Sequence, residues 1–188
     1  NTIYVWDPGM GDYLVYNGFT GSGTPFIAPF QAFWVRADAP APVLRMHPAA
    51  KGLGGGFQGK QQDTSKEAHD PAILRMELRK DSLLAIARFT FTEQGQLGED
   101  PWDAYRLQPL GDTFLKLYTI SPATSLPLVI NNLPKDLDQA VTLPLYVGGQ
   151  AGPGTPISGQ YHLEWHSLTD LPEGWTLTLM DHELKTAT

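Results

Sequence analysis

Apolar and polar residues alternate with period two through most of the chain after residue 72. Between residues 74 and 79, every second position is apolar and each position between them is charged. This period predicts β-strands, because successive side chains of a strand point to opposite faces. Clusters of Asp, Gly, Pro and Asn separate the runs. The runs cover residues 74–79, 83–91, 105–107, 114–120, 126–130, 141–147, 161–165 and 175–179.

About eight short strands at this spacing predict an all-β fold, an antiparallel β-sandwich of jelly-roll or immunoglobulin-like type. No window of helical length carries a 3.6-residue period, although residues 135–139 could form one short helical turn. The second part of the chain, residues 72–188, is therefore expected to be a β-sandwich module.

The first 46 residues carry their own strand signals. Apolar runs at 3–6 and 13–16 are ended by Asp-Pro-Gly and Asn-Gly, which are strong turn signals, and a third run covers 32–36. We expect residues 1–46 to be a small β-hairpin segment, the end of a preceding sheet. The Gly-rich and polar stretch that follows predicts a linker or long loop over 47–71. Because strand-like runs lie close to both ends, we also expect the chain to be a piece of a longer protein.

Composition narrows the function classes. The 188 residues include 13 Lys and Arg against 20 Asp and Glu, a formal net charge of -7, and no Cys. An acidic chain lacks the basic face on which nucleic-acid binding depends. No run approaches the ~18 apolar residues of a membrane span. Without Cys there are no disulfides, no thiolate chemistry and no Cys-based zinc sites.

One acidic loop is a candidate metal site. Glu99, Asp100 and Asp103 are the densest group of carboxylates, and oxygen ligands at this spacing could gather Ca²⁺. The EF-hand spacing is absent, and Asp and Pro also form ordinary turns whose side chains bind local amides. Both interpretations stay open; no other cofactor is expected.

His162, Glu164 and His166 alternate along one strand and share a face. Side chains two residues apart on a straight strand lie about 7 Å from one another, too far for all three to reach one metal ion. We therefore expect these three side chains to face water. The remaining histidines show no ligand-like spacing with them.

The sequence contains no motif of a known catalytic machinery: no G-x-S-x-G, H-E-x-x-H, P-loop or dinucleotide fingerprint. We expect no enzyme. Aromatic residues crowd the N-terminal part, and Tyr16, Trp34 and Trp102 could act as platforms for sugar rings. The alternative is that the N-terminal aromatics form a hydrophobic core.

Two sets of segments resemble parts of large surface proteins that are exported by the type IX secretion route. The first set is a Tyr-rich hairpin followed by an I-x-P-x-Q-x-F-(F/W)-V strand, here IYVWDP at 3–8, YLVYN at 13–17 and IAPFQAFWV at 27–35. The second set is similar to the β-sandwich module that precedes the C-terminal sorting domain. Its Asp-Ala-x-(Lys/Arg)-Leu strand matches DAYRL at 103–107, with Arg106 where Lys is usual, and WTLTLMD stands at 175–181.

The resemblance implies a secreted or cell-surface protein and a module without catalytic residues. We expect a structural module that mediates protein–protein interaction, either with other segments of its parent protein or with like subunits through strand edges. The alternative is a carbohydrate-binding accessory module of an extracellular hydrolase, with polysaccharide as its partner.

Overall fold

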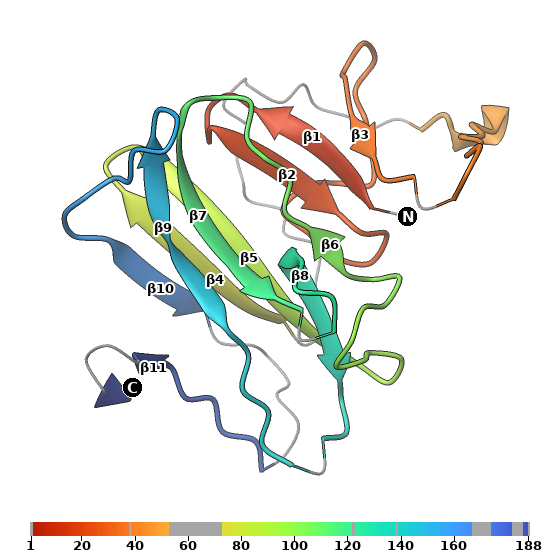
Figure 1. Ribbon diagram of the computed structural model, residues 1–188. Coiled ribbons are helices and arrows are strands. Elements are labelled where there is room, and N and C mark those ends of the chain that lie inside the picture. Colours follow the sequence, from red (N-terminus) through yellow and green to blue (C-terminus); the bar gives the residue numbers. More distant parts are fainter. Residues whose placement is uncertain are drawn as a thin grey trace.

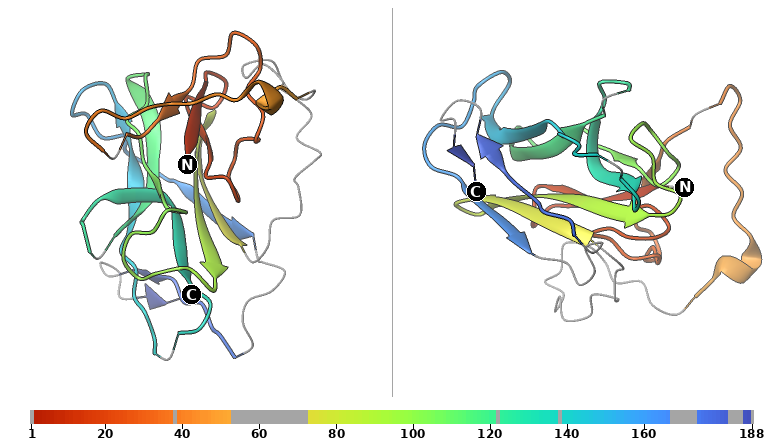
Figure 2. Two further views of the ribbon diagram at one scale, coloured as in Figure 1. Left: turned by 90° about the vertical axis from the view of Figure 1, so that its right-hand side faces the viewer. Right: turned by 90° about the horizontal axis from the view of Figure 1, so that it is seen from below.

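The protein is nearly all-β, as its alternating pattern predicts (Figures 1 and 2). A short 3-10 helix, η1 (Pro48–Ala50), is the one helical element in the described part of the chain. The computed structural model describes residues 2–37, 39–52, 73–121, 123–137, 139–166, 174–181 and 186–187.

The described strands form three sheets. One is antiparallel and three-stranded, with β1 (Ile3–Asp7) between β2 (Asp12–Tyr16) and β3 (Trp34–Val35). A second pairs β11 (Met180–Asp181) with β12 (Thr186–Ala187). The third is seven-stranded, in the order β10-β4-β5-β8-β7-β9 with β6 paired to β8. Its strands are β4 (Ile73–Lys80), β5 (Leu83–Thr92), β6 (Ala104–Tyr105), β7 (Thr113–Ile120), β8 (Pro127–Pro134), β9 (Leu145–Ala151) and β10 (His162–His166).

The seven-stranded sheet is a curled half-barrel. All its neighbouring strands are antiparallel except β5 and β8, which run parallel, so its pairing is mixed and not purely antiparallel. Seen from below, β7 and β9 lie opposite β4 and β5 (Figure 2, right). The curl thus encloses one apolar space between parts of the same sheet.

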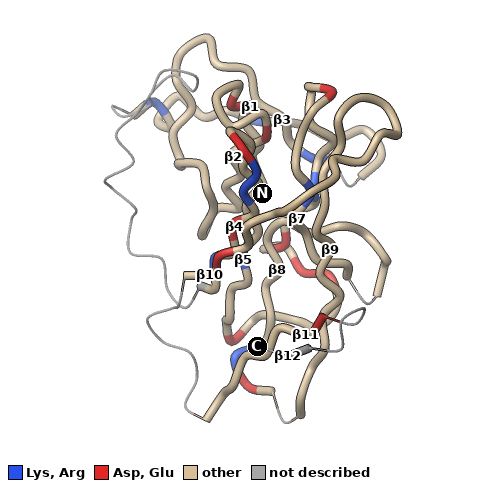
Figure 3. Tube along the Cα trace, turned by 90° about the vertical axis from the view of Figure 1, so that its left-hand side faces the viewer, with Lys and Arg blue, Asp and Glu red and all other residues tan. Residues whose placement is uncertain are grey.

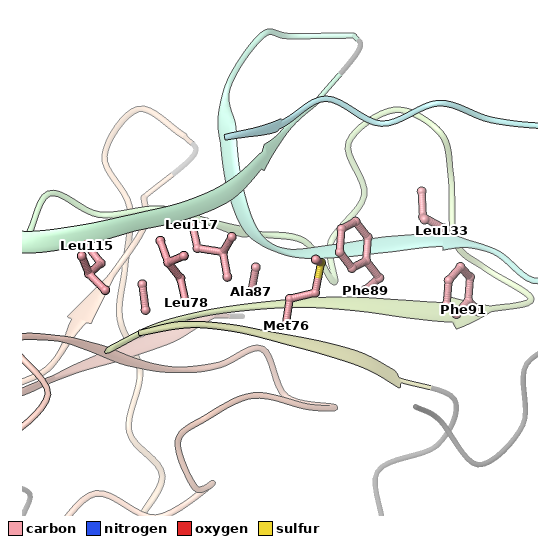
Figure 4. Close-up of a cluster of buried hydrophobic side chains, with 9 residues drawn as sticks. Met76, Leu78, Ala87, Phe89, Phe91, Leu115, Leu117 and Leu133 are labelled. Carbon is pink, nitrogen blue, oxygen red and sulfur yellow. The ribbon is translucent and has the colours of Figure 1, made fainter. Parts of the chain in front are cut away.

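Period-two alternation fills this space from both sides. Leu78 on β4 and Leu115 and Leu117 on β7 are each exposed by 1% or less. In Figure 4 the leucines of β7 point toward the side chains of β4 and β5, with Phe89 and Phe91 toward one end. Burying such side chains supplies the main favourable term in folding.

Loop residues close the open side of the curl. Ile157 and Tyr161, between β9 and β10, pack on the core, and so does Trp175. The indole of Trp175 meets the ring of Phe91 edge to face, with centroids 5.3 Å apart. The core is therefore sealed by side chains from irregular segments as well as by strands.

The N-terminal three-stranded sheet packs on β6 and β8. Tyr4 and Tyr13 form a second apolar cluster with Ala104 and Ile130. Polar contacts reinforce this junction. The side-chain amide of Asn17 donates to the backbone carbonyl of Trp102, and Thr2 and Asp12 make further polar contacts across the junction. The N-terminal aromatic residues that face β6 and β8 are therefore part of a hydrophobic core. The sequence had left two interpretations open for the N-terminal aromatics, a hydrophobic core and platforms for sugar rings.

One buried arginine joins the N-terminal sheet to β7. The Arg106 guanidinium lies 3.6 Å from the Asp12 carboxylate and donates to the carbonyl of Leu115 at 2.9 Å. Burial raises the pKa of Asp12, an effect that the nearby Arg106 opposes. Arg106 thus joins the hairpin to the curled sheet through an ion pair with Asp12 and a charge-assisted hydrogen bond to Leu115.

Strand boundaries follow the sequence pattern in most places, with several departures, such as β6, which includes only Tyr105 of the run predicted at 105–107. Residues 175–179 form no strand, because Trp175 instead caps the core. The run predicted at 141–147 begins only at Leu145, immediately after Pro144, which cannot donate to a ladder. The strand predicted at 32–36 is reduced to β3.

The predicted linker falls largely outside the described residues, since 53–72 are not described. The division into segments 1–46, 47–71 and 72–188 stays a prediction. Within residues 135–139, the described positions form no helical turn.

Replacing Tyr4 with Ala tests whether the N-terminal sheet belongs to the same cooperative unit. Tyr4 is 2% exposed and packs against β6 and β8, so we expect Tyr4→Ala to lower the free energy of unfolding by about 3–5 kcal/mol in a single transition. Denaturant unfolding measures this, with Tyr16→Ala, at a half-buried position, as a milder control. An unchanged main transition preceded by a separate small one would contradict a shared core.

Candidate functional site

Charged residues alternate along β4 where it pairs with β10, and Figure 3 shows both strands from that side of the molecule. Arg75, Glu77 and Arg79 share the outer face because they alternate with the core residues of β4. The Glu77 side chain is only 4% exposed; it is bound by Arg75, with Nη2 to Oε1 at 2.5 Å, and by Arg79. A buried carboxylate needs such partners, since burial of an unpaired charge is costly.

Strand β10 adds one acidic and two imidazole side chains to this face. Glu164 lies directly across from Glu77, and His166 places Nε2 4.0 Å from Oε1 of Glu77. His162 Nε2 lies 2.8 Å from Oε1 of Glu164, and this hydrogen bond is the main cause that lowers the pKa of Glu164. As predicted, the three side chains of β10 face water, while Leu163 packs on the core.

Glu77, Glu164 and His166 offer ligand atoms within 4.8 Å of one another, a spacing that could hold a metal ion. The sequence argument considered β10 alone and so missed Glu77, which only strand pairing brings beside Glu164. Two guanidinium groups already bind Glu77, and they would repel a cation there. The arrangement is best described as an ion-pair cluster on β4, in which Arg75 and Arg79 bind the buried Glu77, and beside which β10 places His166 and Glu164.

Glu77→Gln tests this role. The change leaves two guanidinium groups without their carboxylate, so we expect the free energy of unfolding to fall by about 1–3 kcal/mol. Glu164→Gln is the matched control: Glu164 is 43% exposed, and exposed pairs contribute little. Urea unfolding of both variants measures the difference. Equal, small effects would show that the buried carboxylate does not stabilise the sheet.

The acidic loop is built around backbone and amide donors. Asp103 accepts from the backbone N–H of Asn132 at 2.7 Å and from that of Asp100 at 3.0 Å. Asp100 accepts from the Asn132 side-chain amide at 2.9 Å and from the N–H of Trp102 at 2.8 Å. The Glu99 carboxylate accepts from the Tyr105 hydroxyl.

Among the described residues, the three carboxylates of this loop do not converge on one point as Glu77, Glu164 and His166 do. The Asp100 and Asp103 side chains instead tie the loop to β8, in the manner of the ordinary turn interpretation. Ca²⁺ binding by Glu99, Asp100 and Asp103 stays a prediction. Asp103 opens the DAYRL motif and Arg106 lies near its end, and both act as buried structural anchors.

Burial raises the pKa of Asp103 to about 7, even though its two N–H donors act to lower it. The unfolded chain releases this proton near the ordinary value of 3.8. Between these two values the folded state binds more protons than the unfolded state does. Raising the pH across this interval therefore lowers the free energy of unfolding.

Asp103→Asn removes this titration. We expect the wild type to lose stability relative to Asp103→Asn as the pH rises from 5 to 8. Thermal unfolding at both pH values measures the difference, and Asp136→Asn, at an exposed position, is the control. If the wild type and Asp103→Asn show parallel pH dependence, Asp103 does not hold its proton in the folded state.

The predicted aromatic platforms are not gathered on one face. Strand register places Tyr16 opposite Ile3 and Trp34 opposite Tyr4, on opposite faces of the three-stranded sheet. Trp34 is 37% exposed and contacts Tyr13 edge to face. Trp102 is half-buried and meets the ring of Phe19. One row of rings therefore cannot include both Tyr16 and Trp34, and polysaccharide binding stays a prediction.

Edge strand β9 is only partly covered. Ala151 N–H donates to the carbonyl of Thr155 at 2.8 Å, and Ile157 N–H donates to the carbonyl of Gly149 at 3.1 Å. Odd-numbered residues of β9 therefore direct their backbone groups away from β7. Leu145 and Val147 are also odd-numbered, so their backbone N–H and C=O groups point away from β7 as well. No described segment pairs with these groups.

The uncovered part of β9 also exposes large side chains. Tyr146 is 43% exposed and Val147 41% exposed. The strand LYVGGQA contains no charge and no proline, the devices that commonly block an exposed edge. Residues 145–148 thus present a short strand edge on which another strand could pair.

Two small hollows lie in the described surface. One is lined by residues such as Val5, Leu14 and Tyr16, the other lies between the hairpin and the curled sheet and includes Arg88. Each has room for roughly one water molecule.

No family model, curated protein or solved structure matches the chain. None of the described helical segments is long and apolar enough to cross a bilayer. The resemblance to type IX surface proteins therefore rests on the quoted sequence segments alone.

Proposed function

We propose that this chain is a non-catalytic interaction module that binds an extended polypeptide segment along β9. The observation that carries the proposal is the uncovered stretch 145–148, where Leu145 and Val147 direct their N–H and C=O groups away from β7. In strand addition, main-chain hydrogen bonds to such an edge supply affinity, and the side chains on either face supply selectivity.

The contrast between the two edges of the sheet supports β9 as the binding edge. β10 carries His162, Glu164 and His166 toward solvent, and charged residues discourage pairing of edge strands. β9 has no such residues and is already paired over Gly149–Ala151 by residues 155–157. That short pairing shows that the edge geometry accepts an antiparallel neighbour.

The setting that we propose is a secreted or cell-surface protein, with the curled sheet belonging to the β-sandwich class. Support comes from the type IX resemblance of segments 3–35 and 103–107. The small hollows favour a surface that binds along an edge over one that encloses a substrate. A carbohydrate-binding accessory module is the alternative; Trp34, exposed at the edge strand β3, would be its platform.

Val147→Pro tests the proposal. Proline removes the outward N–H of an edge strand without removing a bond to β7, because Val147 does not donate to β7. The probe is a synthetic heptapeptide of alternating threonine and valine flanked by lysines. We expect the wild type and Val147→Ala to bind it and Val147→Pro to lose binding, as measured by calorimetric titration.

A second peptide, N-methylated at its valines, is the control for the peptide. It lacks the valine N–H groups and therefore cannot donate hydrogen bonds along one of its two edges. Thermal unfolding establishes that Val147→Pro keeps its fold. If folded Val147→Pro binds the peptide as the wild type does, or if the wild type does not bind it at a concentration at which the protein is monomeric, the β9 edge is not the binding surface.

A further inference from the structure

An aromatic stack ends at the open edge of β9. Tyr118 on β7 and Tyr146 on β9 are directly opposite in the register, and their rings are parallel within 5° with centroids 4.8 Å apart. This separation equals the spacing between neighbouring strands, about 4.8 Å. The two rings therefore stack along the direction in which strands are added to the sheet.

One face of the Tyr146 ring is covered by Tyr118, and the residue is still 43% exposed. A strand added beyond β9 would place its directly opposite side chain one strand spacing further along the same stack. The side chain that best continues the stack is another planar ring, because offset-stacked aromatic pairs add stability beyond the area that they bury.

We propose that the strand added to β9 is the β9 strand of a second copy of this chain, antiparallel, with Tyr146 facing Tyr146 across a two-fold axis. This inference rests on the proposed function and names the partner. Residues 155–157 already cover Gly149–Ala151, so the axis must lie within 145–148. An axis at Tyr146 places Leu145 of each copy opposite Val147 of the other.

This register satisfies the open backbone groups. Leu145 and Val147 both direct N–H and C=O outward, so each opposite pair exchanges two hydrogen bonds, and symmetry provides two such pairs. Tyr146 then occupies the non-hydrogen-bonded position between them, where side chains of opposite strands come closest.

The other face of the strand is complementary as well. Val147 lies opposite Leu117 and is 41% exposed, and the register would cover it with Leu145 of the second copy. The whole chain has a net charge of -7, which opposes association of two copies, but β9 contributes no charge to the contact. We expect a dimer and no larger assembly. Each copy uses its β9 edge in the contact, so no free β9 edge is left for a third copy.

The absence of Cys in the wild type allows a single-cysteine test. Tyr146→Cys places two thiols at the non-hydrogen-bonded position across the axis, within disulfide reach. Tyr118→Cys is the matched control: it also removes the tyrosine stack, but its two positions would be separated by three strand spacings, about 14 Å, which no disulfide can span.

After mild oxidation, we expect a disulfide-linked dimer of Tyr146→Cys and monomer for Tyr118→Cys on non-reducing gels. Sedimentation velocity of the wild type over a concentration series should show a monomer–dimer equilibrium that Val147→Pro loses and Val147→Ala keeps. Equal cross-linking of the two cysteine variants, or a wild type that stays monomeric, would overturn the proposal.

The outcomes separate this inference from the proposed function. If the heptapeptide binds in a Val147-dependent way but Tyr146→Cys does not cross-link, the edge accepts a foreign segment and the second copy is excluded. If neither occurs, both the partner and the binding edge are excluded.

Discussion

A sheet that does not close on itself ends in two edges, and each edge leaves a row of backbone N–H and C=O groups without a strand partner. This constraint governs the curled sheet of the present protein. The chain protects β10 with ionisable side chains and covers the end of β9 with residues 155–157. Residues 145–148 of β9 have neither form of protection from any described segment. The proposed function follows from this difference between the two edges.

The interior of the curl fixes which groups reach that edge. Leu115 and Leu117 must point into the core, so Tyr118 must point outward, and its register partner Tyr146 shares that outer face. The same alternation on β4 places Glu77 outside, where Arg75 and Arg79 bind it. Core packing, the charged face and the aromatic stack are therefore consequences of one period-two pattern.

The sequence predicted those features that depend on local alternation. The all-β class, the hairpin of β1 and β2 and the outward direction of His162, Glu164 and His166 all follow from it. The sequence did not predict the features that depend on pairing between distant segments. Glu77 lies beside Glu164 because β4 pairs with β10. The outer edge of β9 is open because, among the described strands, β9 pairs with β7 alone.

Irregular segments were the other source of error, for a related reason. The run around Trp175 has the composition of a strand, yet the side chain caps the core end beside Phe91, a position that no local pattern encodes. The carboxylates of Asp100 and Asp103 bind Asn132 of β8, 29 or more residues further along the chain, which is a contact that local sequence does not reveal. The sequence left both a calcium site and an ordinary turn open for this loop, because it does not show the contacts with β8.

Amide hydrogen exchange, resolved by residue, tests the central claim most directly. In dilute protein, the account predicts rapid exchange for the N–H groups of Leu145 and Val147 and protection for those of Tyr146 and Gly148, which point toward β7. As the protein concentration rises, Leu145 and Val147 should become protected. Equal protection of all four amides in dilute protein would show that the edge is already filled and would contradict the account.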